Sequence, residues 1–409
     1  MKARVAILTT ARSDYGLLSG VIGLAKEVFK VDVLITGSHH LQSLNLTRQE
    51  VESDWSEDGK VELINFDGMD VDQSATGQLA TLSKTMLLLQ DHLSKTEYDA
   101  VIFLGDRWEL WSATIPFFLT GTVLAHISGG ETTEGAIDDS IRHSHTMMSH
   151  LHFVANQEYA RNVSLMGVED WRITVSGECG LDAIFSTPMV SEDVLTQQFG
   201  VRFERPIVIV TFHASMLASS MPISLQVSNL LVAVSKFPDY LFVFTSPAME
   251  QGYEVIQQGI ADYIACHKNA LYVPSFGRDN YISMMKKSFI VLGNSSSGIV
   301  EAPSLGIPSI NVGDRQKTRM AGESVLHIPC ESSQIESALR LCSSDDHRSF
   351  CRGSINPYDP HKDGRNCERI VSTLECALNL RDKNSLLKKS FSNKVDEEEW
   401  NFFWRKLNE

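Results

Sequence analysis

Acidic and glycine residues follow two apolar segments of the chain. The segment Gly105–Glu109 comes directly after the apolar run Ala100–Leu104, and the segment His126–His143 begins at the end of the run Thr122–Ile127. If both runs are buried strands of an open α/β sheet, a ligand binds outside their carboxyl ends. Several carboxylates around one crevice suit general acid/base chemistry, because crowding separates their pKa values. We therefore expect chemistry rather than packing from these two segments.

A turn rich in glycine and serine, Gly293–Gly298, follows the apolar run Phe289–Leu292. A turn from strand to helix exposes backbone N–H groups and hydroxyls, which suits phosphate. Glu301 is poorly placed for phosphate, but it can accept hydrogen bonds from ribose hydroxyls. The two features together indicate a nucleotide diphosphate. The same pattern would also arise from an ordinary strand, turn and helix with a serine N-cap.

Three basic side chains also follow apolar runs. Arg12 lies in the turn Thr9–Gly16, which lacks the Gly-x-Gly-x-x-Gly fingerprint and so disfavours NAD. Arg12 could reach a phosphate or could be a solvated loop residue. His213 ends the run Ile207–Phe212, and Arg315 follows the last apolar run of the series. Positions at the carboxyl end of a strand favour function, although a structural role for His213 is equally open.

The elements that must position these residues alternate between strand and helix patterns. Strands are expected over Arg4–Thr10, Val31–Ile35, Val61–Phe66, Ala100–Leu104, Thr122–Ile127, Leu151–Ala155, Arg172–Val175, Ile207–Phe212, Tyr240–Thr245, Ala270–Val273, Phe289–Leu292 and Pro308–Val312. Helices are expected over Gly16–Phe29, Gly77–Lys95, Leu225–Phe237 and Asn366–Leu380. Such alternation implies right-handed βαβ units and doubly wound parallel sheets.

The pattern breaks in the polar stretch Ser186–Arg205. We therefore predict an α/β protein of two Rossmann-like domains, residues 1–185 and 186–370, facing each other across a cleft. The helix Asn366–Leu380 could cross back to the first domain. Residues 371–409 form the rest of this helix and a tail, with a linker over Arg381–Asn393. An amphipathic helix over Asp396–Leu407 would cap the body or dock a partner.

Composition excludes several classes of function. The 409 residues carry a net charge of −15 without a dense Lys/Arg block before the tail, which argues against nucleic acid and membrane partners. The apolar stretch after Arg4 is too short for a signal peptide, and no apolar run reaches the roughly 18 residues of a membrane span. Seven cysteines without a Cys-x-x-Cys pair fit free thiols in the cytoplasm. We expect no metal and no cofactor, because the motifs contain no ligand cluster with metal spacing.

Taken together, the motifs resemble the hydrolysing UDP-N-acetylglucosamine 2-epimerases of sialic acid biosynthesis. The matching segments fall in order over roughly residues 1–325 and are Arg12–Gly16, Gly105–Arg107, Gly129–His143, Phe212–His213, Gly293–Ser296 with Glu301, and Gly313–Gln316. The resemblance implies a two-domain fold similar to that of the B-type glycosyltransferases. We also expect a homo-oligomer, a dimer or tetramer, that binds a UDP-sugar.

The reaction that the resemblance implies has two stages. A base removes the C2 proton of UDP-N-acetylglucosamine, and UDP leaves from C1 to give a 2-acetamidoglucal. Water then adds to C1 and a proton returns to C2 from the opposite face, which gives N-acetylmannosamine and UDP. The resemblance places Asp106, Glu131 and Asp138 in the acid/base region, with His126 orienting a carboxylate or the sugar. It places at UDP positions the residues Arg12, Arg107, His213, Ser295, Ser296, Glu301 and Arg315.

Some departures from the family pattern leave the base and the substrate open. Certain members carry Glu at the position of Ser128, and here Glu131 and Glu134 are both available, so the identity of the C2 base is open. The sugar could also be UDP-2,4-diacetamido-2,4,6-trideoxyglucose, with the loops Ser38–Leu46 and Asp67–Thr76 deciding between the two. Of these loops, the polar residues His39, His40, Gln42 and Asn45 would suit sugar hydroxyls. The chain could instead be a B-type glycosyltransferase or a non-catalytic UDP-sugar-binding protein.

Overall fold

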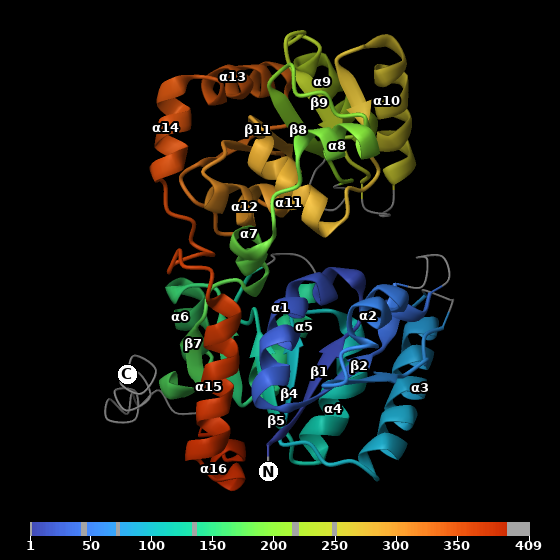
Figure 1. The fold of residues 1–409 in the computed structure, drawn as a ribbon, viewed down its shortest axis with the longest axis vertical. Coiled ribbons are helices and arrows are strands. Elements are labelled where there is room, and N and C mark those ends of the chain that lie inside the picture. The colour runs from blue at the N-terminus through green and yellow to red at the C-terminus, as the bar shows by residue number, and fades with distance from the viewer. Residues whose placement is uncertain are drawn as a thin grey trace. The chain divides into compact units, whose positions relative to one another are not determined.

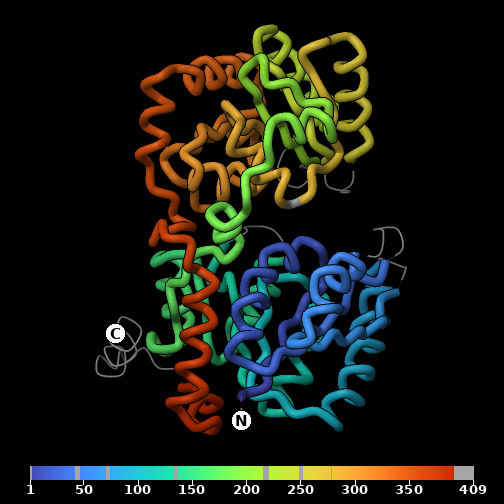
Figure 2. The backbone as a smooth tube through the Cα atoms, in the orientation of Figure 1, coloured from blue at the N-terminus to red at the C-terminus, as the bar shows by residue number. Residues whose placement is uncertain are grey.

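The chain forms two compact units, each built on its own parallel sheet. The computed structural model describes residues 2–41, 47–70, 74–132, 137–214, 221–247 and 252–390. The first unit consists of Met1–Asp182 and Arg365–Glu409, and the second of Ala183–Gly364 (Figure 1). Figure 2 shows the chain entering the second unit once and returning to the first. Residues 396–407, for which an amphipathic helix is predicted, lie outside the described residues.

The first unit holds a seven-stranded sheet in the order β3-β2-β1-β4-β5-β6-β7, and every neighbouring pair is parallel. Its strands are β1 (Arg4–Thr9), β2 (Lys30–Ile35), β3 (Val61–Asn65), β4 (Ala100–Leu104), β5 (Val123–Ile127), β6 (Leu151–Val154) and β7 (Ile173–Val175). Its helices are α1 (Arg12–Val28), α2 (Arg48–Trp55), α3 (Ala75–Leu93), α4 (Trp111–Leu119), α5 (Ile137–Met148), α6 (Gln157–Leu165), α15 (Asn366–Leu380) and α16 (Lys383–Leu387).

Continuous apolar strands are needed here because helices cover both faces of the sheet. On one face, the strand residues pack with α1 and α15, which brings Ile370 and Leu374 into the same core as Val5. On the other face, the strands pack with α3 and α4, including Phe117. In Figure 1 the C-terminal helix α15 runs beside α1, although the two are far apart in sequence.

The second unit holds a six-stranded parallel sheet in the order β10-β9-β8-β11-β12-β13. Its strands are β8 (Ile207–Thr211), β9 (Leu241–Phe244), β10 (Ala270–Tyr272), β11 (Ile290–Gly293), β12 (Ser309–Val312) and β13 (Val325–Ile328). Its helices are α8 (Glu192–Phe199), α9 (Ile223–Val234), α10 (Tyr253–Cys266), α11 (Arg278–Lys287), α12 (Ser297–Val300), α13 (Ser332–Cys342) and α14 (Asp345–Gly353); α7 (Asp182–Ser186) begins where the first unit ends.

The predicted α/β class with doubly wound parallel sheets is confirmed. In each unit the strand order reverses once, between β1 and β4 in the first and between β8 and β11 in the second. Ligands of open α/β sheets bind at such switch points, outside the carboxyl ends of the strands. Strand β13 was not predicted, and α1 begins at Arg12 rather than at Gly16. Within the described residues, no helix is long and apolar enough to cross a membrane.

Candidate active site

A buried arginine gathers the acidic residues of the first unit. Arg142 of α5 is only 2% exposed, and its guanidinium forms an ion pair with Asp106, which follows β4. It also lies 3.2 Å from Asp139 Oδ1 and donates a hydrogen bond of 2.9 Å to the backbone carbonyl of Glu131. One side chain thus connects the loop after β4, the loop after β5 and helix α5. Arg142 was not among the predicted site residues, although its helical spacing of three from Asp139 signals the ion pair.

Asp138 lies one residue before Asp139 at the start of α5 and is solvent-accessible. Partial burial of its carboxyl raises its pKa, and the charge of Asp106 raises it further, while Arg142 and Arg107 act in the opposite direction. Asp106 is held as the partner of a buried cation, whereas Asp138 keeps its proton to a higher pH than usual. An ion-paired carboxylate beside a carboxyl that keeps its proton gives the site a candidate base and a candidate acid.

Glu131 ends a tightly held turn after β5 and is 5% exposed. Gly130 has a φ of +78°, and a Cβ on it would lie 2.5 Å from the carbonyl oxygen of Tyr159. Asn162 Nδ2 donates to the Gly130 carbonyl at 2.9 Å, and Arg142 holds the next carbonyl. These contacts of the turn therefore fix the backbone position of Glu131. Glu134, the other candidate from the sequence, lies outside the described residues.

His126 supports the backbone next to Asp106. It is fully buried, and its Nε2 lies 2.8 Å from the carbonyl oxygen of Gly105, while Nδ1 lies 3.4 Å from Thr146 Oγ1. Burial lowers the pKa of His126 to about 4, so the ring is neutral and Nε2–H donates to Gly105. A neutral, buried imidazole is suited to orienting the loop that carries Asp106.

The two arginines predicted at UDP positions in the first unit differ in environment. Arg12 is half-exposed, and its Nε lies 3.0 Å from Glu50 Oε2. Arg107 Nη2 forms a 2.6 Å ion pair with Glu109 Oε1, and Glu109 is 1% exposed. The buried carboxylate anchors the Arg107 guanidinium at the switch point between β1 and β4. Glu109 was not predicted as a site residue, although it stands two residues after Arg107 in the same motif.

The two histidines that were expected to face sugar hydroxyls are buried. His39 contacts Thr9 Oγ1 through Nε2 and Thr47 Oγ1 through Nδ1, both at 2.9 Å. His40 Nε2 lies 3.2 Å from the carbonyl oxygen of Ile35. Both ring nitrogens of His39 bond to hydroxyls within the protein, so the prediction that His39 bonds sugar hydroxyls is wrong. Gln42 and Asn45 lie outside the described residues.

In the second unit, Asn294 joins the two strands that flank the switch point. Its Oδ1 accepts the backbone N–H of His213 at 2.6 Å, and its Nδ2 donates to the His213 carbonyl at 2.9 Å. Arg315 Nη1 lies 3.3 Å from the Asn294 carbonyl oxygen. Burial, followed by the nearby charge of Arg315, lowers the pKa of His213 to about 4. The structure thus brings His213 and Arg315 together around Asn294.

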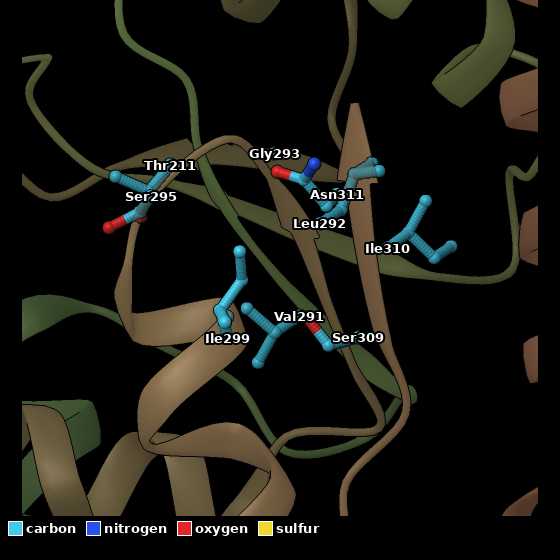
Figure 3. Close-up of a pocket in the computed structure, with 10 residues that line it drawn as sticks. Thr211, Val291, Leu292, Gly293, Ser295, Ile299, Ser309, Ile310 and Asn311 are labelled. Atoms are coloured by element: carbon cyan, nitrogen blue, oxygen red, sulfur yellow. The ribbon is translucent and has the colours of Figure 1, made fainter. Parts of the chain in front are cut away.

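The glycine at the start of this turn is required by close packing. Gly293 has a φ of +137°, and a Cβ there would lie 1.9 Å from the carbonyl oxygen of Thr211. Figure 3 shows Ser295 and Thr211 near the carboxyl ends of the strands, beside a small cavity that Asn311 also lines. Ser296 is the N-cap of α12 but makes no side-chain cap hydrogen bond, so a purely capping role does not hold for Ser296.

Glu301 is the C-cap of α12 and carries a buried carboxyl oxygen, Oε2, for which the described residues supply no hydrogen-bond partner. Burial raises the pKa of Glu301 to about 7. A buried polar atom without a partner is costly, and a ligand that donates a hydrogen bond would remove that cost. Glu301 Oε2 can therefore accept a hydrogen bond from a ligand, and its contact with a ribose hydroxyl stays a prediction.

Two doubly wound parallel units define a fold similar to that of the B-type glycosyltransferases. The chain belongs to the UDP-N-acetylglucosamine 2-epimerase family, whose model matches residues 24–375. The family resemblance predicted from the motifs is confirmed.

Relatives and solved structures agree with this assignment. Polysialic acid biosynthesis protein P7 of Escherichia coli is 31% identical over 371 residues, which cover 90% of this chain and 93% of that protein. The hydrolysing GDP/UDP-N,N'-diacetylbacillosamine 2-epimerase of Campylobacter jejuni is 28% identical over 366 residues, which cover 85% and 89%. The fold matches the UDP-GlcNAc 2-epimerase of Neisseria meningitidis, solved with UDP-GlcNAc, with a TM-score of 0.72 at 19% identity over 91% of this chain and all of that one.

Proposed function

We propose that this chain is a hydrolysing UDP-N-acetylglucosamine 2-epimerase, which converts UDP-N-acetylglucosamine and water to N-acetylmannosamine and UDP. The observation that carries the proposal is the pair Asp106 and Asp138, an ion-paired carboxylate beside a carboxyl of raised pKa. The matching family and its hydrolysing relatives support it.

The chemistry needs both a positioned carboxylate and a stabilised leaving group. The sugar C2–H bond is weakly acidic because no carbonyl is adjacent to C2. As the carboxylate takes this proton, the C2–H electrons form the C1=C2 bond, and UDP leaves with the electrons of the C1–O bond. Water then supplies oxygen to C1, and an acid returns a proton to C2 from the other face. Two faces require two acid/base groups, which Asp106, Glu131 and Asp138 can provide.

For the nucleotide, we propose that the second unit supplies Ser295, Ser296 and Glu301, together with His213 and Arg315. The hydroxyls and the cation suit the diphosphate, and the Glu301 carboxylate suits the ribose hydroxyls. Contacts of Arg12 and Arg107 with UDP stay a prediction from the family resemblance.

Turnover without an acceptor tests the reaction class. UDP release from UDP-N-acetylglucosamine in D₂O is expected to give N-acetylmannosamine with deuterium at C2, and H₂¹⁸O is expected to label C1. A non-hydrolysing epimerase would instead give UDP-N-acetylmannosamine, and a glycosyltransferase or a binding protein would release no UDP under these conditions. Full retention of the substrate hydrogen at C2 would exclude the elimination.

Replacing Glu301 with alanine is expected to weaken UDP binding. Losing one hydrogen bond to a charged group costs about 1.5–3 kcal/mol, which is roughly 10–150-fold in Kd. Calorimetric titration with UDP measures this. The variant Glu254→Ala removes an exposed glutamate of the same unit and should leave Kd unchanged. Equal affinity in Glu301→Ala and wild type would remove Glu301 from the nucleotide site.

A second substrate deserves the same assay. Two of the similar proteins are hydrolysing 2-epimerases of N,N'-diacetylbacillosamine nucleotides, from Campylobacter jejuni and from Legionella pneumophila at 25% identity. The two sugars differ at C4 and C6, and a site built to bond hydroxyls rejects an analogue that lacks them. A kcat/KM more than about tenfold higher for UDP-2,4-diacetamido-2,4,6-trideoxyglucose would change the substrate and keep the reaction type.

A further inference from the structure

We propose that Glu178 is a positioning residue that holds Ser128 in a left-handed conformation and thereby sets the turn that carries Glu131. The inference rests on the proposed function, because Glu131 is one of its acid/base residues. Glu178 has no part in the reaction described above, and it lies beyond β7, two strands away from β5 in the sheet.

The backbone of Ser128 adopts a conformation that side-chain-bearing residues rarely take. Among the described non-glycine residues, positive φ occurs at Ser128, with 63°, and at Lys362, with 53°. Ser128 is 8% exposed, and its backbone N–H donates to the Phe153 carbonyl at 2.8 Å. A left-handed serine is disfavoured on its own and persists where its surroundings fix it.

Glu178 holds Ser128 in this left-handed conformation. Ser128 Oγ donates to Glu178 Oε2 at 3.2 Å, and the Cys179 thiol lies 3.6 Å from Oε1. Glu178 is 7% exposed, and its own carbonyl accepts a hydrogen bond of 3.1 Å from Asn366 Nδ2 on α15. Because a hydrogen bond from Asn366 fixes the backbone of Glu178, the Glu178 carboxylate can hold Ser128 in place.

The turn after Ser128 leaves little room for adjustment. A Cβ on Gly129 would lie 3.1 Å from both His126 Nδ1 and Thr146 Oγ1, and Gly130 packs against the Tyr159 carbonyl. The chain then reaches Glu131, whose carbonyl Arg142 holds. Because each residue of the turn is confined, a change of the Ser128 dihedral angles must move Glu131. The same hydrogen bond thus connects the end of β7 to an acid/base residue after β5.

Three variants separate positioning from acid/base chemistry. Glu178→Ala removes the acceptor and is expected to lower kcat about tenfold, the effect of losing one hydrogen bond to a charged group. Glu178→Gln keeps an acceptor oxygen for Ser128, so kcat should stay within about threefold of wild type. KM and the Kd for UDP should hardly change in either. A proton-transferring Glu178 would instead lose activity as glutamine, and that result would overturn the proposal.

The double variant gives the sharpest test. Ser128→Gly adopts positive φ without a side-chain bond. In that background, adding Glu178→Ala should change kcat by less than about twofold, because the hydrogen bond is already absent. An equal loss in both backgrounds would show that Glu178 does not act through Ser128. Ser128→Ala, which keeps the unfavourable backbone but loses the donor, should be less active than Ser128→Gly.

Amide hydrogen exchange of residues 126–132, measured without substrate, keeps this inference separate from the proposed function. Exchange should be faster in Glu178→Ala than in Glu178→Gln. If exchange is faster in Glu178→Ala but the wild-type protein does not release UDP, the proposed function is refuted and the positioning role of Glu178 stands. Unchanged exchange in an active enzyme would refute the positioning alone. Should Glu178→Ala fail to fold, Ser128→Ala compared with Ser128→Gly makes the same distinction.

Discussion

Asp106→Asn, Glu131→Gln and Asp138→Asn are each expected to lower kcat by at least about 10²-fold, because a general acid or base contributes at least that much. UDP release at saturating substrate measures the loss, and circular dichroism checks the fold. Asp139→Asn is the matched control: it removes a neighbouring charge that contacts Arg142 but keeps the Asp106–Arg142 ion pair. It should lose less than about tenfold, since it holds no acid/base role.

The same variants identify the base. A variant that no longer exchanges the C2 proton but still hydrates an added 2-acetamidoglucal has lost the residue for the first step. A variant that exchanges the proton but does not hydrate the glucal has lost a group of the second step. Turnover near the wild-type rate in all three variants would refute the assignment of this carboxylate cluster.

Acidification below pH 6.5 is expected to unfold the first unit. Five buried histidines have lowered pKa values, mainly through burial: about 4 for His39 and His126, about 3 for His145 and His150, and well below the usual value for His152. The unfolded chain binds these protons first, so stability falls as pH drops from 6.5 towards the folded pKa values. Each histidine costs up to about 1.4 kcal/mol per pH unit, a slope that is reached where the unfolded histidine is protonated and the folded one is neutral.

Together the five histidines cost up to about 7 kcal/mol per pH unit, which is comparable to the whole stability of a typical domain. Urea unfolding measured between pH 7 and 5 tests this, with each unit monitored by hydrogen exchange. His152→Leu is the informative control, because neither ring nitrogen of His152 has a partner among the described residues. That variant should reduce the slope of stability against pH by up to about 1.4 kcal/mol per pH unit. A stability that does not change between pH 7 and 5 would contradict the prediction.

Strand positions in this protein follow from sequence because parallel strands buried on both faces are continuous apolar runs. Ala100–Leu104 is predicted with the bounds it has as β4. The missed strand, β13, is an edge strand whose Leu326, His327 and Ile328 are only partly buried or exposed, so its pattern lacks an apolar run. The first turn of α1 was missed because its start depends on Asp14, which accepts the backbone N–H of Ala11.

The site was predictable where a motif stands at the end of a strand, as with Asp106 or Gly293. It was not predictable where contacts join distant segments. Arg142 on Asp106 and Glu178 on Ser128 connect residues that are 36 and 50 positions apart, and no local pattern encodes such pairs. His39 was assigned to sugar hydroxyls because it is polar, whereas two threonine hydroxyls bond its ring nitrogens inside the protein.

Because the chain returns to the first unit after forming the second, the two units complete their folds in a set order during synthesis. Helix α15 completes the core around α1, yet it is made only after the whole second unit. A ribosome adds residues one by one from the N-terminus, and domains fold as they emerge. Until α15 is made, α1 covers only part of that apolar face of the first unit, and the second unit can fold first. The first unit therefore completes its core only after α15 has been synthesised.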